Sequence, residues 1–332
     1  MHTKVPVRVD GRFRLGDILG SGSYAVVYRA RNIIKEDALA VAIKLEPISH
    51  SSSVQREYKV LKHLEGGVGI PHVHWFGRES TYHALVLDLL GPSLHDLFLT
   101  HNNKFSLDTV VNLGDQLLSR LEYIHSHHYI HGDIKPQNVV VGLGDLSDTI
   151  FLIDFGIAKE FWNTSNNSTI TWGVELGRRD DLESLTYMLI YFLQGSLPWL
   201  TSDKDKLCSS SILECKVNTT IEDLCQGIPV EFATILIYTR SLAFSEDPDY
   251  NHLRSLLHAL RSSSAPAACL LDFKQPDAPI THSPPFSHSP WLIEAVPPCP
   301  PLRRSTRILR PLNGPPLHAA TSTPRRKQTR VG

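Results

Sequence analysis

The sequence of 332 residues has no long apolar run and little net charge. Its longest apolar stretch, around 185–193, is far shorter than the roughly 18 residues that a membrane span requires, and residues 1–20 have no apolar core typical of a signal peptide. We therefore expect an intracellular protein, in the cytoplasm, the nucleus or both. The 33 Lys and Arg residues nearly balance 34 Asp and Glu residues, and 42% of all residues are apolar. This composition excludes a uniformly basic nucleic-acid binder and a wholly disordered chain.

The five cysteines form no C-x-x-C pair, and their number is odd. Both features disfavour a disulfide framework and a zinc-binding module. We expect these residues to be ordinary reduced thiols.

The average charge hides a change in composition at about residue 273. Residues 275–332 include 13 prolines and carry 8 basic and 2 acidic side chains, a net charge of +6. Residues 1–274 carry 25 basic and 32 acidic side chains, a net charge of −7. The proline-rich segment cannot bury enough apolar surface to offset the entropy lost on ordering. We expect a folded, moderately acidic body and a basic, disordered tail over 274–332.

Hydrophobic periodicity divides the body into two parts. Residues 13–88 have the pattern of short strands with one helix, and residues 93–260 have mostly longer helical patterns. One long helix begins after Ser106, which is placed to cap it, and apolar residues recur along one face. The stretch 181–193 is apolar nearly all round after its first turn, as in a buried helix. These patterns predict an α+β fold with a small β-rich lobe before a larger, mainly α-helical lobe.

A glycine-rich turn separates two of the expected strands. It reads G-S-G-S-Y-A-V-V and begins with Gly20, Ser21 and Gly22. Glycine lets a turn approach a phosphate without a clash at Cβ. A plain hairpin turn explains the glycines equally well, since Ala25 occupies the third position of G-x-G-x-x-G. The place between two strands favours a cover over nucleotide phosphates rather than a dinucleotide-binding turn, which opens a helix.

The segment V-A-I-K ends at Lys44, and strand alternation places Lys44 on the same face as Ala42. Ala42 leaves room for a flat ring beside the cation. A single strand lysine is usually solvated, and a single helix glutamate is usually exposed. Glu57, however, lies 13 residues later in a helix expected over 54–64. A pair between Lys44 and Glu57 would fix the ammonium group against nucleotide phosphates.

The most specific motif is H-G-D-I-K-P-Q-N, which directly follows the helix that begins after Ser106. In it, Asp133 can orient a hydroxyl and accept its proton, Lys135 can neutralise charge on a transferring phosphoryl group, and Asn138 can offer an amide oxygen to a metal ion. The motif D-F-G begins at Asp154 after a strand-like segment and supplies a second hard oxygen ligand for Mg²⁺. Each motif alone could be a polar turn. Their order and context together indicate phosphoryl transfer.

These motifs resemble those of eukaryotic protein kinases, and most of all those of the casein kinase 1 family. Further family-level matches are V-A-I-K-L-E, G-G-V-G-I-P, L-L-G-P-S-L, R-R-D-D-L-E-S, G-S-L-P-W, E-F-A-T and D-P-D-Y. The resemblance covers about residues 12–273, with lobes of about 12–88 and 91–273. It implies a serine/threonine kinase that binds ATP and Mg²⁺ and transfers the γ-phosphoryl group to protein hydroxyls.

The resemblance also implies a role for individual residues. The residues implied for nucleotide binding are Gly20, Ser21, Gly22, Lys44, Glu57, Asp88, Leu90 and Asp154, and 87–90 is the implied adenine-binding hinge. The residues implied for catalysis are Asp133, as the base, Lys135 and Asn138. Asn138 and Asp154 are the implied magnesium ligands, and Asp181 would tie the catalytic loop in place. The expected partners are protein substrates, including acidic or casein-like ones. We expect a monomer, with no membrane or nucleic-acid partner.

The sequence departs from the family at two places. Gly132 stands where most members carry Arg, which removes the cation that would answer a phosphate on the activation loop. Only the 21 residues 157–177 separate D-F-G from R-R-D-D, so part of the family's substrate-docking loop is missing. A misplaced acceptor can slow transfer on the order of 100-fold. Three explanations stay open: an alternatively spliced or mispredicted chain, a functional short loop, and a pseudokinase scaffold that binds nucleotide with little catalysis.

The tail contains basic clusters at 303–307 and 324–327. They fit a nuclear-import signal or a nucleic-acid contact, and equally a solvated tail that preserves solubility. Besides an active kinase and a scaffold with little catalysis, association with DNA or RNA through the tail is therefore a third hypothesis. It requires binding that depends steeply on salt and is lost when residues 300–332 are deleted.

Overall fold

The computed structural model describes residues 5–22, 24–34, 39–49, 53–163, 168–169, 176–200, 209–261 and 271. The predicted tail over 274–332, with both basic clusters, lies outside the described residues, as do residues 164–167 and 170–175 of the short segment. Cys215 and Cys225 are unpaired, as expected, and the other three cysteines lie outside the described residues. No helix in the described part of the chain is both long and apolar enough to cross a bilayer.

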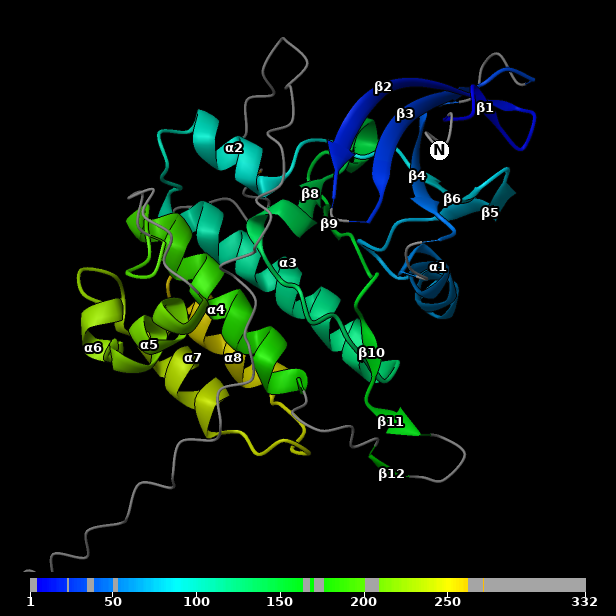
Figure 1. Ribbon diagram of the computed structural model, residues 1–332. Helices are drawn as coiled ribbons and strands as arrows, with labels where there is room; N and C mark the ends of the chain where they lie inside the picture. The colour runs from blue at the N-terminus through cyan, green and yellow to red at the C-terminus, as the bar shows by residue number, and fades with distance from the viewer. Residues whose placement is uncertain are drawn as a thin grey trace, which may run out of the picture. The chain divides into compact units, whose positions relative to one another are not determined.

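An antiparallel sheet of six strands forms the N-terminal lobe (Figure 1). Its strands, in spatial order, are β1 (Arg8–Val9), β2 (Phe13–Ser21), β3 (Val26–Asn32), β4 (Val41–Pro47), β6 (Tyr82–Asp88) and β5 (Val73–Glu79). The expected alternation in β4 is confirmed, because Val41, Ile43 and Leu45 are buried on one face and Lys44 projects from the other. In this register Lys44 lies opposite Val27 of β3 and Leu85 of β6.

One helix, α1 (Ser53–His63), packs against β4, β5 and β6. Its buried residues, Val54, Glu57, Val60 and Leu61, recur at helical spacing and form one face. This confirms the helix expected over 54–64, with both ends shifted by one residue. The burial of Glu57 on that face is unusual for a carboxylate and requires a partner.

The C-terminal lobe is mainly helical, as predicted. Its helices are α2 (Leu94–Thr100), α3 (Leu107–Ser126), α4 (Arg178–Gln194), α5 (Ser209–Asn218), α6 (Ile221–Leu224), α7 (Val230–Ser241) and α8 (Tyr250–His258). The hydroxyl of Ser106 accepts a hydrogen bond from the backbone N–H of Thr109 and caps α3, as expected. Helix α4 is buried along most of its length and packs against α3 and α7, which confirms the buried helix predicted over 181–193 (Figure 1).

Short two-stranded ribbons and 3₁₀ turns carry the polar motifs. The ribbons pair β7 (Tyr129–Ile130) with β10 (Lys159–Glu160), β8 (Val139–Val141) with β9 (Ile150–Leu152), and β11 (Trp162–Asn163) with β12 (Ser168–Thr169), and the 3₁₀ turns are η1 (Pro136–Asn138) and η2 (Gly144–Leu146). The H-G-D-I-K-P-Q-N motif lies between β7 and β8, and D-F-G follows β9. The sequence predicted strand β9 but not its partner β8 or the strands of the other two ribbons.

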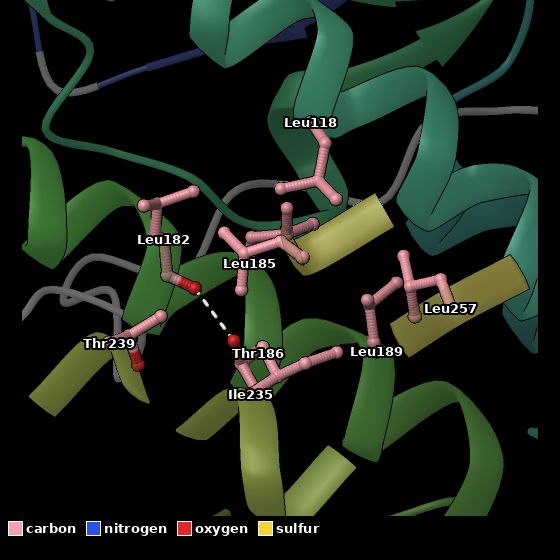
Figure 2. Close-up of a pocket in the computed structure, with 9 residues that line it drawn as sticks. Leu118, Leu182, Leu185, Thr186, Leu189, Ile235, Thr239 and Leu257 are labelled. Atoms are coloured by element: carbon pink, nitrogen blue, oxygen red, sulfur yellow. Dashed lines mark hydrogen bonds between the residues drawn. The ribbon is translucent and has the colours of Figure 1, made fainter. Parts of the chain in front are cut away.

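A small cavity lies in the helical lobe (Figure 2). It has a volume of about 10 Å³ and is lined by Leu118, Leu182, Leu185, Thr186, Leu189, Ile235, Thr239, Leu253 and Leu257. The hydroxyl of Thr186 donates a hydrogen bond of 2.8 Å to the carbonyl of Leu182, so it does not need a ligand there. A buried water needs roughly 10–15 Å³ and several polar partners. This cavity is therefore a packing defect and not a binding site.

Candidate active site

The catalytic-loop candidate Asp133 lies between two donors. Its Oδ2 atom accepts a hydrogen bond of 2.8 Å from the Asn138 amide and lies 2.6 Å from the ammonium nitrogen of Lys135. Its Oδ1 atom is buried and has no hydrogen-bond partner in the described part of the chain. Buried carboxylate oxygens are normally bonded, and an unpaired one costs free energy. A donor from a bound molecule, such as a hydroxyl group, would satisfy Oδ1.

The amide group of Asn138 is fixed by the same loop. Its NH₂ group donates to the backbone carbonyl of Asp133 at 2.9 Å and to the Asp133 carboxylate at 2.8 Å. Both amide hydrogens are thereby committed, and the amide oxygen is left as an acceptor. Asn138 and the carboxylate of Asp154 form a donor set of hard oxygens, which suits Mg²⁺.

A metal held by these two residues would need further ligands from outside the protein. Within the described residues, no group of three or more His, Cys, Asp or Glu side chains is arranged to hold a metal ion. Mg²⁺ in nucleotide sites usually takes one or two protein ligands and completes its shell with water and phosphate oxygens. The residues present therefore fit a magnesium–nucleotide complex.

Lys44, Glu57 and Asp154 come together from a strand, a helix and a loop. The Lys44 ammonium donates to Glu57 Oε2 at 2.7 Å and to Asp154 Oδ1 at 2.8 Å. The Glu57 side chain is 2% exposed, whereas that of Asp154 is 44% exposed. The predicted pair between Lys44 and Glu57 is thus formed, and the more open Asp154 completes it on the solvent side.

Lys44 and Asp154 hold each other in the ionised form. Burial alone would lower the pKa of Lys44, but the carboxylates of Asp154 and Glu57 outweigh burial and raise that pKa. The charge of Lys44 lowers the pKa of Asp154 to about 2. Burial raises the pKa of Glu57, and the charge of Lys44 opposes this change. A fixed cation beside an exposed carboxylate is the arrangement that can receive a polyphosphate and its metal ion.

The D-F-G backbone is held in an uncommon conformation. Asp154 has a φ of +66°, in the left-handed region that non-glycine residues seldom adopt. The flanking residues are tied down: Ile153 N–H donates to the carbonyl of Asn138 at 3.0 Å, and Phe155 N–H donates to Glu57 Oε1 at 3.3 Å. The surrounding contacts therefore determine the orientation of the Asp154 carboxylate.

Asp181, at the start of α4, holds the loop of the H-G-D-I-K-P-Q-N motif, as expected. It is 1% exposed and accepts hydrogen bonds of 2.8 Å from the backbone N–H groups of His131 and Gly132. It also pairs with His125 Nε2 at 2.8 Å, and His125 Nδ1 lies 2.5 Å from the hydroxyl of Tyr250 in α8. Burial would raise the pKa of Asp181, but its hydrogen bond to His125 and the other partners outweigh burial and lower that pKa. Residues from α3, α4 and α8 thus fix one loop.

The ring of His131 is held by two backbone groups. The backbone N–H of Asp133 donates to Nδ1 at 3.2 Å, and Nε2 lies 3.1 Å from the backbone carbonyl of Ile153. In these two contacts Nδ1 faces a donor and Nε2 faces an acceptor, which fixes the orientation of the ring. The ring also packs edge-on against Phe155 and so joins the two polar motifs.

The glycine-rich turn does not need its glycines for its own conformation. Gly20 and Ser21 pair with Val27 and Val26, and Gly22 N–H donates to the carbonyl of Ala25 at 2.8 Å. Neither glycine has a positive φ, and a Cβ atom at Gly20 would meet nothing within 4 Å. At Gly22 it would lie 3.6 Å from the carbonyl oxygen of Ala25, an ordinary contact. The space left by the missing side chains is therefore available to a ligand, which favours a phosphate cover over a plain turn.

The carboxylate of Asp88, at the end of β6, is turned towards β5. It accepts a hydrogen bond of 2.9 Å from His72 N–H and lies 2.8 Å from His74 Nε2. Burial would raise its pKa, but the hydrogen bonds from His74 and His72 outweigh burial and lower that pKa. The backbone N–H of Asp88 is also bound, because it donates to the carbonyl of His72 at 3.2 Å. Leu90 lies half-buried in the connection between β6 and α2.

Several residues that the sequence analysis did not single out shape this site. They are Glu46, Arg56, His125 and Tyr250. The only sequence signal for Glu46 is strand alternation, which places it on the same face of β4 as Lys44. The other three act through contacts with distant segments, for which spacing offers no signal.

A comparison with protein-family models matches residues 13–226 to the protein kinase domain. The match covers more than half of the chain and includes the glycine-rich turn, both polar motifs and α4.

Proposed function

The chain belongs to the protein kinase family, and from this premise we propose that it is a serine/threonine kinase of the casein kinase 1 type. Membership supports a phosphotransferase that binds ATP and acts on proteins. The finer assignment is supported by the motif segments between V-A-I-K-L-E and D-P-D-Y. The observation that carries the proposal is the buried, unpaired Oδ1 atom of Asp133, beside Lys135.

In this proposal Asp133 receives the proton of the acceptor hydroxyl. The hydroxyl donates to Oδ1, its oxygen bonds to the γ-phosphorus of ATP, and the bond to the leaving ADP oxygen breaks. Lys135 stands beside Asp133 to neutralise charge on the moving phosphoryl group. Lys44, oriented by Glu57, contacts the other phosphates, and Gly20 to Gly22 cover them.

Asn138 and Asp154 would hold Mg²⁺, which would offset the negative charge of the phosphates. We propose the domain bounds 12–273, acidic protein substrates and a monomeric state on the resemblance, and a cytoplasmic or nuclear location on the short apolar stretches of the sequence. The preserved contacts favour transfer over a scaffold without catalysis. A scaffold would not need the ion pair of Lys44 and Glu57 together with the bonds of Asn138 to Asp133.

The proposal is tested by magnesium-dependent transfer of labelled phosphate from ATP to casein. Asp154→Asn should lower the rate by roughly 100-fold or more, because it removes the charge of a metal ligand at little change in shape. The matched control is Asp148→Asn, an exposed carboxylate near β9, which should leave the rate unchanged. Equal rates in the wild type and Asp154→Asn would refute the proposal, and label found only on tyrosine would refute the serine/threonine assignment.

A further inference from the structure

The strand that carries Lys44 also carries a buried carboxylate two residues later. Glu46 is 0% exposed, which is rare for glutamate unless it is paired. Its Oε1 atom accepts a hydrogen bond of 2.6 Å from the hydroxyl of Ser53, and its Oε2 atom accepts one of 3.1 Å from the backbone N–H of Val54. Both donors belong to the first turn of α1.

Glu46 therefore caps α1 from a different element of the structure. The first N–H groups of a helix have no partner within the helix, and the helix dipole favours negative charge there. Most helices use a side chain directly before the helix as the cap. Here the cap comes from β4, whose ladder with β3 and β6 also fixes the backbone of Lys44. The cap thus ties the start of α1 to the strand that carries the lysine.

This tie lies one helical turn from the ion pair. Glu57 follows Val54 by three residues, and both face the sheet from the buried side of α1. The second carboxylate oxygen of Glu57 holds Phe155 N–H at 3.3 Å, and Arg56 donates to the carbonyl of Gly156 at 3.3 Å. A shift of the first turn would therefore move the partner of Lys44 and the D-F-G segment together.

We propose that Glu46 is a positioning residue for phosphoryl transfer, which holds the first turn of α1 on β4 so that Glu57 reaches Lys44. The proposal rests on the proposed function for its effect on turnover. Its structural part, the restraint of α1, stands independently of turnover.

The first experiment measures hydrogen exchange in the full chain without nucleotide. In Glu46→Ala, amide exchange should rise by about tenfold or more over 53–63 and at Phe155, with no change in α3. The matched control is Ser106→Ala, which removes the cap of α3 and should raise exchange only at the start of that helix. Unchanged exchange in α1 of Glu46→Ala would overturn the proposal, even if the wild type transfers no phosphate.

The second experiment is a double-mutant cycle on kcat/KM for ATP. Glu46→Ala should lower this value by roughly 100-fold, as expected when a catalytic group is displaced by about 1 Å. In the Glu57→Gln background the same change should cost at most about twofold, because both residues act through one ion pair. If the effects of Glu46→Ala and Glu57→Gln on kcat/KM simply multiply, the loss at Glu46 is a general loss of stability, and the positioning role is overturned.

A milder pair of variants keeps the test decisive if Glu46→Ala fails to fold. Ser53→Asp brings a second carboxylate against Glu46, whereas Ser53→Asn has the same shape without the charge. Because like charges in a buried site repel strongly, Ser53→Asp should give at least about tenfold lower kcat/KM and faster exchange in α1 than Ser53→Asn. Equal behaviour of the two variants would overturn the proposal.

Discussion

Two adjacent aspartates at the start of α4 should respond in opposite ways to the same substitution. Asp181 accepts three hydrogen bonds, from His131 N–H, Gly132 N–H and the His125 ring. Asp180 is also mostly buried but accepts its hydrogen bond from Gly177 N–H, at 2.6 Å. We predict that Asp181→Asn destabilises the protein at neutral pH and that Asp180→Asn stabilises it.

The loss at Asp181 follows from its acceptor count. Asparagine offers one acceptor oxygen, so its NH₂ group must face at least one of the donors that Asp181 now satisfies. A lost hydrogen bond to a charged group costs about 1.5–3 kcal/mol, and an unpaired buried donor costs about 1–3 kcal/mol. The expected destabilisation of Asp181→Asn is therefore about 3–5 kcal/mol. Since the pKa of Asp181 is lowered, its stabilising effect is complete above about pH 4 and is lost as the pH falls through the lower native value.

The gain at Asp180 follows from the opposite shift. Burial raises its pKa from 3.8 to about 6, against the hydrogen bond from Gly177. Between these values the folded chain holds the proton and the unfolded chain has lost it, so raising the pH from about 4 to about 6 destabilises the wild type. The difference between the pKa of Asp180 in the folded and in the unfolded chain corresponds to at most about 3 kcal/mol in the free energy of unfolding. Asp180→Asn keeps an oxygen for Gly177 N–H and removes this cost, so it should stabilise the protein by about 1–3 kcal/mol at pH 7.5 and much less at pH 4.5.

The measurement is urea unfolding of the full chain, followed by tryptophan fluorescence at pH 4.5 and pH 7.5. At pH 7.5 the urea concentration at the midpoint of unfolding should be lowest for Asp181→Asn, higher for the wild type and highest for Asp180→Asn. Between pH 4.5 and pH 7.5 the free energy of unfolding should fall more in the wild type than in Asp180→Asn. The same direction of change in both variants at pH 7.5 would refute the reasoning, because it rests on the distinct partners of the two carboxylates.

Three further predictions separate packing from ligand binding. Gly22→Ala should shift the melting temperature by less than about 2 °C, since the added Cβ meets only an ordinary contact. It should raise the Kd for magnesium–ATP in calorimetry, and an unchanged Kd would contradict the phosphate-cover assignment. Gly132→Arg should lower phosphate transfer to casein and destabilise the fold by about 1–2 kcal/mol, because residue 132 has a φ of +75° and its Cβ would lie 3.3 Å from Leu176 Cδ1. Faster transfer in Gly132→Arg than in the wild type would contradict this prediction. Leu189→Ala should enlarge the cavity of Figure 2 and lower the free energy of unfolding in urea by about 2–5 kcal/mol. The KM for ATP should not change, and a changed KM would link the cavity to the active site.

The sequence predicted local features well because they depend on neighbouring residues. Strand alternation in β4, the Ser106 cap and the buried α4 follow from spacing and residue type alone. Contacts between distant segments did not follow, because periodicity shows which face is buried and not which atoms it meets. The carboxylate of Asp88 is an example: it meets His74 next to an irregular register between Val73 and Trp75 of β5, which no sequence pattern indicated.

The described residues around Gly132 show how the chain packs without the arginine that most family members carry there. Gly132 suits its left-handed backbone, and Leu176 lies where a larger side chain at this position would begin. Two residues after Leu176, the start of α4 is fixed by Arg178. Its guanidinium group lies over the ring of Phe161, donates to the carbonyl of Ser245 at 2.8 Å and pairs with Asp247. These apolar, aromatic and ionic contacts need no phosphate. Leu176 thus lies where the arginine side chain of most family members would begin, so the described residues on this side of the loop pack without that cation.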